Sequence, residues 1–583
     1  RIALVSDELD SVPRRDYPTI TSFHDRAEMD TLQRELRTFE GVSVLIYSQT
    51  CATEKRRRRK RGTMQDPDRH VVINQAVCEG CGDCSVASNC LSVEPVDTPL
   101  GRKRKINLSS CNKDFTCLDG FCPSFVTVEG PRLTATPTAA SLPDITAALA
   151  ALAPPNLPRV GDPYDILLTG VGGTGVTTVG AVLSMAAHLD GSATTLLNFS
   201  GLAQKFGAVM SFVRLAADPA MLHQTRIAAG AADAVIGCDA VVSASPQAMK
   251  TYRKGTAAIL NHAEMITGEI VKNRDLDLQM DDRIAAIAAA CGQDSIDGFD
   301  ASRIAEQLLG DSVYANMIML GAAWQAGMLP VSATAIGQAI TLNGVQVERN
   351  RLAFDIGRLM KDNPDLVTGA ILPPQAPPAP ESYDDIVDHR SGLLTAYQDA
   401  GYAARYRAHL DGFAARCDDV ALQTIVARQL YRMMAYKDEY EVARLHSDPA
   451  FRAQIDAQFA PGYRTANHLV IPFLTRATDS RGRPKKTMTR LVRPLFPLLA
   501  KGKRLRGSFF DPFARQTERR IERGLIDWYL NLMNRFDPAQ DPASWRAILG
   551  GASEIRGFGP VKMEAITRVQ TEVEAQLRSL DNA

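Results

Sequence analysis

The stretch "CEGCGDCSVASNC", Cys78–Cys90, places four cysteines in thirteen residues. Three more follow in the same region: Cys111, Cys117 and Cys122. We see no signal-peptide pattern, so a reducing cytoplasm is the expected compartment. A disulfide framework is disfavoured there, and clustered thiolates indicate a metal.

The spacing of these cysteines separates zinc from iron–sulfur. Cys78, Cys81 and Cys84 form a C-x2-C-x2-C run. A structural zinc usually takes two separated ligand pairs, whereas a [4Fe–4S] cluster takes three ligands from such a run and a fourth from a distant Cys-Pro. Cys122-Pro123 supplies that element, and the glycines inside the run allow the backbone to curl. The pattern predicts one [4Fe–4S] cluster on Cys78, Cys81, Cys84 and Cys122.

The other three cysteines leave a second cluster open. Cys90, Cys111 and Cys117 bring the total to seven thiolates, one short of the eight that two such clusters need. Either the second cluster has an unusual ligand, for which Asp114 is near in sequence, or some of these cysteines are structural. Both interpretations remain open at this point.

Bulk composition describes a soluble multidomain protein. The chain has 583 residues and a formal net charge of zero, so three or four domains are expected and neither nucleic acid nor a membrane surface is an expected partner. The uncharged stretch from Ser312 to Val347 contains Pro330 and several polar residues. It predicts two packed soluble helices rather than a membrane span.

A glycine-rich loop forms the second motif, "LLTGVGGTGVTTVG" from Leu167. It reads as a strand, a loop and a helix, and such a loop offers backbone N–H groups to an anion. Val176 stands where a P-loop has lysine, and the next strand ends at Asn198 without the carboxylate of an NAD site. A different phosphorylated ligand or a tight structural turn remains. The candidate loop residues are Gly170, Gly172, Gly173 and Gly175.

Three polar residues interrupt the apolar, glycine-rich segment "NFSGLAQKFGAVMSFVRL". They are Gln204, Lys205 and Arg214. We take them as candidate cofactor contacts, with plain surface charges as the alternative.

The order of apolar and linker segments predicts a multidomain α/β protein. Residues 1–62 read as strand, helix and strand, 63–133 hold the cysteines, and 134–163 form an Ala/Pro-rich linker with one short helix. Residues 164–370 alternate helices with strand candidates, which indicates a parallel sheet. A proline-rich linker, 371–381, precedes a helical region, 382–583. The strand candidates are "YDILLTG", "ATTLLNF", "SFVRLA", "CDAVVSAS" and "TAAILN".

Several segments together resemble one family, the long single-chain indolepyruvate:ferredoxin oxidoreductases within the 2-oxoacid:ferredoxin oxidoreductases. They are "SQTCATEKRRRRKRG", the whole cysteine block, "GVGGTGV" with "GLAQKFGAVMSFVR", "MMAYKDEYEVARL", "KGKRLRGSFFDPF" and "ERRIERGLIDWY". The resemblance implies that 1–62 end a thiamine-diphosphate domain, that 63–133 are a ferredoxin-like iron–sulfur insert, that 164–370 are the gamma-type catalytic domain, and that 382–583 are the helical C-terminal domain.

What the resemblance implies chemically is a coenzyme A-dependent oxidative decarboxylation of a 2-oxoacid. Thiamine diphosphate with Mg2+ would carry the substrate, electrons would leave through [4Fe–4S] to ferredoxin, and the enzyme would form a homo-oligomer. The glycine loop would suit the phosphates of coenzyme A, and no catalytic residue is assigned. We find no G-D-G…N signature for thiamine diphosphate, so we expect a C-terminal portion that is inactive alone. The alternative is a non-catalytic electron-transfer adaptor.

Overall fold

The computed structural model describes residues 1–130, 133, 143–160, 163–201, 207–266, 268–371, 381–470, 475, 477–479, 482–490 and 492–581. The chain divides into two compact units. Unit 1 comprises Arg1–Asp68, Asn112–Asp114 and Leu469–Thr487, and unit 2 comprises Arg69–Cys111, Phe115–His468 and Met488–Ala583. The domain boundaries drawn from the sequence remain predictions, because compactness groups the cysteine, α/β and helical regions together in unit 2.

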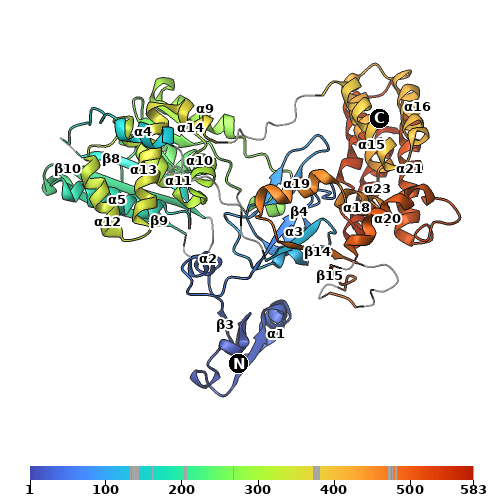
Figure 1. The fold of residues 1–583 in the computed structure, drawn as a ribbon, viewed down its shortest axis with the longest axis horizontal. Coiled ribbons are helices and arrows are strands. Elements are labelled where there is room, and N and C mark those ends of the chain that lie inside the picture. Colours follow the sequence, from blue (N-terminus) through green and yellow to red (C-terminus); the bar gives the residue numbers. More distant parts are fainter. Residues whose placement is uncertain are drawn as a thin grey trace. The chain divides into compact units, whose positions relative to one another are not determined.

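Unit 1 contains a small parallel sheet with one covering helix (Figure 1). Strand β1 (Ile2–Ser6) lies between β2 (Thr21–Asp25) and β3 (Val44–Ser48), and both pairings are parallel. Helix α1 (Met29–Thr38) buries Leu32 and Leu36 against β1. The predicted strand, helix and strand are confirmed, and β2 is an addition. The basic run from Lys55 lies mostly in α2 (Ala52–Lys60).

A six-stranded sheet organises the α/β region of unit 2. Its order is β13 (Ile296–Phe299), β12 (Ala257–Asn261), β11 (Ala234–Gly237), β8 (Tyr164–Val171), β10 (Ala208–Ala216) and β9 (Ala193–Ser200). The strands β8, β11, β12 and β13 pair in parallel, but β10 runs antiparallel to both neighbours. The expected parallel sheet is therefore correct except at β10.

Helices cover both faces of this sheet because its strands are apolar almost throughout and their successive side chains point to opposite faces. One core joins Ile166 and Leu168 of β8 to α5 (Val176–Leu189), α11 (Ala315–Gln325), α12 (Ala333–Asn343) and α13 (Val347–Asp362). The other joins Leu167 to α9 (Met280–Cys291). The two helices expected on either side of Pro330 are confirmed as α11 and α12. No helix in the described part of the chain is long and apolar enough to cross a membrane.

One predicted strand is wrong. The stretch "CDAVVSAS" begins with Cys238 after β11 has ended and contains the short helix α6 (Ala240–Ser243). Asp239 caps this helix by accepting a hydrogen bond from the Val242 N–H, at 2.7 Å. An aspartate at an N-cap favours a helix start over a continuing strand, and that preference decides the local structure here.

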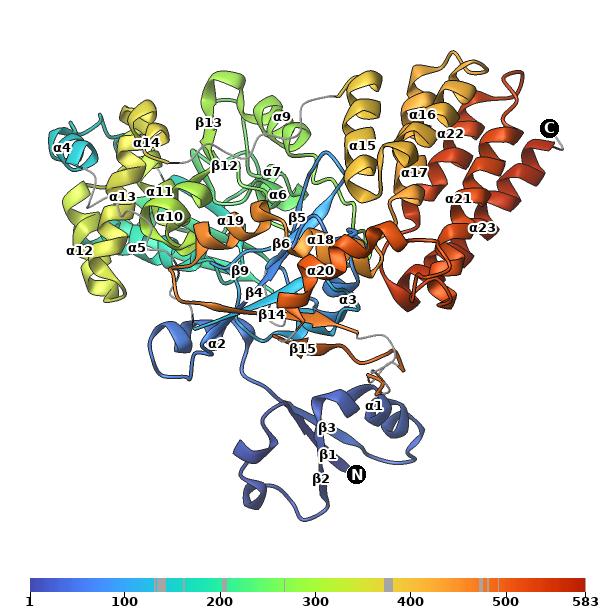
Figure 2. The ribbon, with the colours of Figure 1, turned by 45° about the vertical axis from the view of Figure 1, so that its right-hand side comes forward.

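The cysteine region is built from two antiparallel strand pairs and a short helix. Strand β4 (Arg69–Ile73) pairs with β7 (Phe125–Glu129), and β5 (Val93–Val96) pairs with β6 (Lys103–Ile106). Helix α3 (Asp83–Ser88) follows the C-x2-C-x2-C run. Strand β14 (Arg464–Leu469), from the C-terminal part of the chain, pairs with β7 and extends its sheet (Figure 2). The C-terminal region is thus not purely helical.

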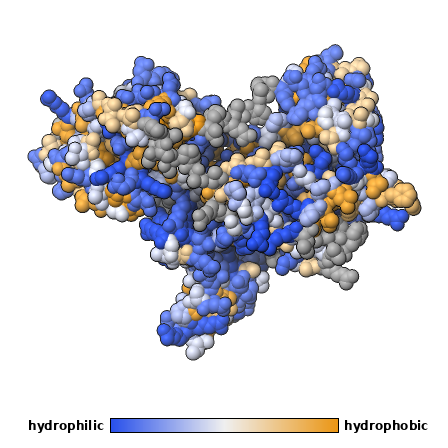
Figure 3. All heavy atoms as spheres, viewed as in Figure 1, coloured by the Kyte–Doolittle hydropathy of each residue, from blue (hydrophilic) through white to orange (hydrophobic). Residues whose placement is uncertain are grey.

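The remainder of the C-terminal region is helical, as predicted. One core packs most of its helices together, with Tyr406, Tyr529 and Trp545 among its largest fully buried side chains. Figure 3 draws one face of the whole chain, and on that face most residues are hydrophilic, with hydrophobic residues scattered among them. The helices are α15 (Tyr383–Tyr397), α16 (Ala400–Ala414), α17 (Val420–Met434), α18 (Glu439–His446), α19 (Pro449–Gln458), α20 (Phe496–Lys501), α21 (Thr517–Arg535), α22 (Pro542–Gly550) and α23 (Gly559–Asp581).

Candidate functional site

The four cysteines assigned to the first cluster lie together. Cys78, Cys84 and Cys122 are buried, and Cys81 is half-buried. Burial, the largest cause, and then the thiols of Cys122, Cys84 and Cys78 raise the pKa of Cys81. The other three thiols are thus close enough to Cys81 to oppose its ionisation. The structure brings together the residues that the C-x2-C-x2-C run and the Cys-Pro pair single out.

Glycines give the loop its curvature. Gly80 and Gly82 have φ angles of +66° and +82°, which side-chain-bearing residues rarely adopt. A Cβ at Gly80 would lie 2.2 Å from the Arg102 carbonyl oxygen. The Gly80 N–H instead donates to Cys78 Sγ at 3.3 Å. The loop therefore turns one backbone donor toward a sulfur.

The other three cysteines are placed less tightly. Cys90 and Cys117 are half-buried against the same apolar core that contains Cys78, Cys84 and Cys122, whereas Cys111 is half-buried outside it. Within the described ranges, no three His, Cys, Asp or Glu side chains, the first four cysteines included, are arranged as ligands of a metal ion. Both clusters remain predictions.

Helix α18 and the residues just before it hold both backbone segments that carry the first ligand set. Lys437 Nζ donates to the carbonyls of Val77 and Cys78, at 3.1 and 3.3 Å, and pairs with Glu79. Asn74 Nδ2 donates to the Leu445 carbonyl at 3.0 Å. No local sequence pattern around Lys437 indicates these contacts, because its partners lie more than 350 residues away in the chain.

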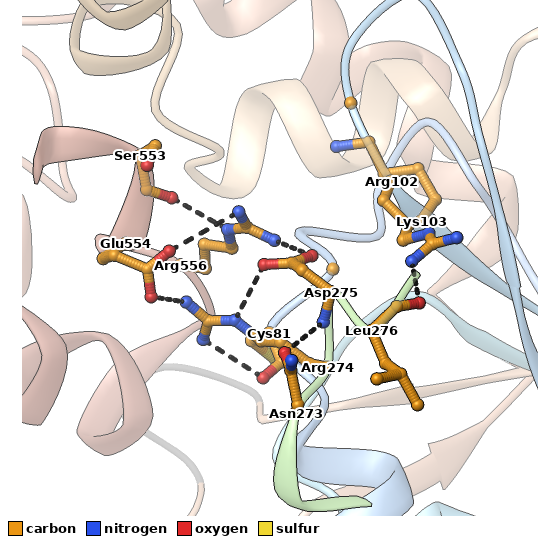
Figure 4. A network of polar contacts seen from close by, with 12 residues as sticks. Cys81, Arg102, Lys103, Asn273, Arg274, Asp275, Leu276, Ser553, Glu554 and Arg556 are labelled. Atoms are coloured by element: carbon orange, nitrogen blue, oxygen red, sulfur yellow. Dashed lines mark hydrogen bonds and ion pairs between the residues drawn. The ribbon is translucent and has the colours of Figure 1, made fainter. Parts of the chain in front are cut away.

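A charged network joins the loop to two further segments (Figure 4). Arg274 donates to the Cys81 carbonyl at 3.4 Å and pairs with Glu554. Arg556 in turn donates to Asp275 Oδ1 at 2.8 Å. The α/β region and the helical region therefore meet at the cysteine loop. The chain positions involved are hundreds of residues apart, and no local sequence signal indicates that they meet.

His446, the last residue of α18, completes the contact with the Cys-Pro element. Its Nε2 donates to the Pro123 carbonyl at 3.0 Å, and its ring stacks on Phe496 with the centroids 5.8 Å apart. Since the carbonyl can only accept, Nε2 carries the proton. Nδ1 is then free to accept from Asn74 Nδ2, at 3.4 Å. The structure thus favours a neutral imidazole.

This contact predicts a loss of stability in acid. Burial, the largest cause, and Arg493 lower the pKa of His446 to about 4, although the Pro123 carbonyl acts in the opposite direction. The unfolded chain, with a histidine pKa of about 6.5, binds a proton that the folded protein excludes. Stability should be fully present above about pH 6.5 and should fall between there and about pH 4, by roughly 3 kcal/mol at most. Denaturant unfolding at several pH values measures it.

A matched pair of variants isolates the histidine. His446→Gln removes the titrating group, so this pH dependence should shrink. His188→Gln changes an exposed histidine on α5 and should leave the dependence in place. An undiminished slope in His446→Gln would show that another group is responsible.

The glycine loop links β8 to α5 through two left-handed residues. Gly173 and Gly175 have φ angles of +87° and +101°, and Gly175 precedes the helix directly. Gly170 is required by packing, because a Cβ there would lie 2.6 Å from a Val176 methyl group. The Gly172 N–H donates to the Gly207 carbonyl at 2.7 Å. Gln204 and Lys205 fall outside the described residues.

Arg214 lies away from this loop. It pairs across the strands with Asp165 near the start of β8, whereas the loop follows the other end of that strand. Its guanidinium forms two hydrogen bonds with the Asp165 carboxylate, at 2.6 and 3.2 Å, and both side chains are buried. The observed contacts of Arg214 are structural, and its part in ligand binding remains a prediction.

Two family models match the chain. Residues 165–360 match the family described as pyruvate ferredoxin/flavodoxin oxidoreductase. Residues 383–575 match a family of unknown function, DUF6537. The two ranges correspond closely to the α/β and helical regions, so the helical part is a distinct module without an assigned role.

Two curated relatives each match about a third of the chain. The "Indolepyruvate oxidoreductase subunit IorB" of Pyrococcus horikoshii is 27% identical over 198 residues, which are 33% of this chain and 94% of the relative. The protein of the same name from Thermococcus kodakarensis is 26% identical over 198 residues, with the same two coverages.

Solved structures overlap the chain only weakly. Pyruvate oxidoreductase subunit PORC from Thermotoga maritima has 21% identity and a TM-score of 0.25 over 34% of this chain and 96% of its own. The gamma subunit of a keto/oxoacid ferredoxin oxidoreductase from Geobacter sulfurreducens has 21% identity and a TM-score of 0.23, over 34% and 98%. The sequence matches alone carry the comparison: residues 165–360 match the pyruvate ferredoxin/flavodoxin oxidoreductase family model, which confirms the resemblance of this chain to the 2-oxoacid:ferredoxin oxidoreductases.

Proposed function

We propose that this chain is the electron-transferring and gamma-type part of a 2-oxoacid:ferredoxin oxidoreductase that acts on indolepyruvate or a related aryl pyruvate. The match of residues 165–360 supports the enzyme class. Two relatives are named as indolepyruvate oxidoreductase subunits, which supports the aryl substrate. Ferredoxin would accept the electrons, and coenzyme A would accept the acyl group.

The gathering of four thiols carries the proposal that the chain transfers electrons. Cys78, Cys81, Cys84 and Cys122 lie close together in a largely buried site, where burial and the neighbouring thiols raise the pKa of Cys81 and of Cys84. A group that accepts four thiolates removes that conflict, and the donor set is the one that [4Fe–4S] clusters take. When bound, such a cluster accepts and releases single electrons.

The surrounding residues would fix the cluster's protein ligands. Lys437 and His446 hold the backbone beside Cys78 and Cys122, and Arg274 holds the carbonyl of Cys81. Hydrogen bonds and burial around the ligands tune the reduction potential of an iron–sulfur site. We therefore assign the helical module a positioning role at the cysteine loop.

The spacing of the remaining cysteines supports a second cluster. Cys111, Asp114 and Cys117 repeat the spacing of Cys78, Cys81 and Cys84, with an aspartate in the middle place. Cys90 would be the third thiolate of that set.

The glycine loop would serve coenzyme A. Gly173 and Gly175 precede α5, a 14-residue helix, and have no side chain of their own to cover their backbone N–H groups. Backbone donors at a helix start suit a phosphate. Thiamine diphosphate and Mg2+ would complete the enzyme, with no residue of this chain assigned to them.

Iron and acid-labile sulfide in the anaerobically purified chain test the proposal. One cluster gives about four irons per chain and two give roughly eight. A chain free of iron after anaerobic reconstitution would contradict the proposal.

Dithionite-reduced protein should then reduce ferredoxin. This chain alone should not turn over indolepyruvate with thiamine diphosphate, coenzyme A and a viologen. A non-catalytic adaptor would show no turnover of indolepyruvate even when the chain is combined with a thiamine-diphosphate-binding part of such an enzyme, whereas the proposed enzyme would.

A further inference from the structure

A cavity lies between the cysteine region and the helical module. Its volume is about 370 Å³, within the range of small-molecule sites. The hairpin turn between β5 and β6, residues 98–103, forms one wall. Helix α17 forms another, with contributions from α21 and α23. Nothing in the proposed electron-transfer chemistry uses this space.

The cavity has a strong excess of positive charge. Eight lysine or arginine side chains line it against three carboxylates. Each carboxylate already has a partner in the wall: Glu79 pairs with Lys437, Glu381 with Arg390 at 3.4 Å, and Glu522 with Lys562 at 2.6 Å. Two further cations are paired outside the lining, Arg102 with Asp97 and Arg556 with Asp275.

Three cations in the wall have no carboxylate partner among the described residues: Lys103, Arg428 and Arg432. Lys103 is only 5% exposed, and its ammonium forms no hydrogen bond within the described part of the chain. Arg432 donates to the Ser553 carbonyl at 2.6 Å, which satisfies one N–H group but not the charge. Arg428 lies four residues before Arg432 on α17, so both occupy one face of that helix. Of the three, Lys103 is buried, Arg432 is half-buried and Arg428 is exposed. Glu79 acts on both Lys103 and Arg432, but one carboxylate that is already paired with Lys437 leaves an excess of positive charge that an anion would balance.

The cysteine ligands account for only part of this positive charge, because Cys78 interacts with Lys103 but is not among the groups that act on Arg432. Successive residues of a strand point to opposite faces, and β6 contains both Lys103 and Arg104. Arg104 turns away from the cavity and donates to the Arg274 carbonyl at 2.7 Å, beside the cysteine loop. Lys103 turns into the cavity instead. The two residues thus serve different places.

The lining also has an apolar part. Leu100, Tyr431, Met433, Leu525 and Ile555 belong to it. We propose that this cavity binds a small organic anion, whose carboxylate or phosphate group lies among Lys103, Arg428 and Arg432 and whose ring or chain contacts the apolar wall. The site is separate from the glycine loop and gives the helical module a ligand of its own.

Calorimetric titration of the full, cluster-loaded chain with phenylacetate, phenyl phosphate and inorganic phosphate tests the proposal. We expect saturable binding of one aryl anion per chain, with a higher affinity than that of inorganic phosphate. Whichever of phenylacetate and phenyl phosphate binds more tightly shows whether the site prefers a carboxylate or a phosphate. Arg432→Gln should weaken binding roughly tenfold or more, because it removes a charged donor. Arg428→Gln, at the exposed rim, should weaken it with little risk to folding.

Arg349→Gln, an exposed arginine on α13 outside the cavity, is the matched control and should bind normally. Three results would overturn the proposal: no saturable binding of any probe, equal affinity in Arg432→Gln, Arg428→Gln and Arg349→Gln, or binding only after the iron has been removed. The last result would mean that these cations balance the cluster.

Discussion

Cys84→Ser is expected to remove about four irons per chain. Cys84 lies in the first turn of α3, is 7% exposed, and packs so closely on Gly120 that a Cβ there would lie 2.8 Å from its Cα. Thiolates are the ligands that iron–sulfur clusters select, and a serine hydroxyl is a poor replacement. Iron analysis and the visible absorption of the reconstituted protein measure the loss.

Two further variants make this result specific. Cys51→Ser changes an exposed cysteine outside the cysteine region and should retain all the iron. Cys117→Ser should also lose about four irons if a second cluster exists, and none if the first stands alone. Circular dichroism would check that each variant folds. A full complement of iron in Cys84→Ser would remove this residue from the ligand set.

The first ligand set could be predicted because its information is local. Three of its members lie within seven residues, and the fourth is marked by the proline that follows it. Gly80 and Gly82 then require the curled backbone that the structure shows. Spacing alone therefore places four thiols together, without any knowledge of the sheet on which the loop lies.

The order of strands could not be predicted in the same way. Alternating apolar residues reveal that a strand exists but do not reveal its neighbour. Strand β10 lies between β8 and β9, so Asn198 of β9 accepts a hydrogen bond from Ser211 of β10 at 2.6 Å rather than facing the glycine loop's strand. In an NAD site, the strand that carries the acid lies directly beside the strand that leads into the glycine loop. Here β10 separates β9 from β8, so the end of β9 is not beside the loop and the residue at Asn198 says little about an NAD site.

The charged contacts around the site were hidden for a related reason. Arg214 looked like a candidate ligand contact, but the register of β10 on β8 places it opposite Asp165. Arg274 and Glu554 meet across an interface that no sequence pattern marks. In a sequence, a charge that neutralises another in the interior looks the same as a charge that faces solvent.

Asp438→Asn is expected to lower the free energy of unfolding by about 3–5 kcal/mol, because it leaves a buried guanidinium without its counter-charge. Asp438 accepts two hydrogen bonds from Arg506, at 2.6 and 2.9 Å, and the two side chains are 3% and 4% exposed. The guanidinium also lies 3.6 Å from the ring centroid of Tyr397. Asp438 is the N-cap of α18, and asparagine caps a helix equally well, so the variant keeps the cap while it removes the charge and one of the two oxygens that accept from Arg506.

Asp541→Asn provides the control, because Asp541 is the exposed N-cap of α22 and has no buried partner. Its denaturant unfolding curve should stay close to that of the unchanged protein. Since α18 leads to His446 at Pro123, Asp438→Asn should also lose iron faster to a chelator than Asp541→Asn does. Equal unfolding curves for the two variants would mean that the Asp438–Arg506 pair contributes no more than a surface cap. If Asp438→Asn is less stable than Asp541→Asn but loses iron at the same rate, the Asp438–Arg506 pair stabilises the fold without affecting the cysteine loop.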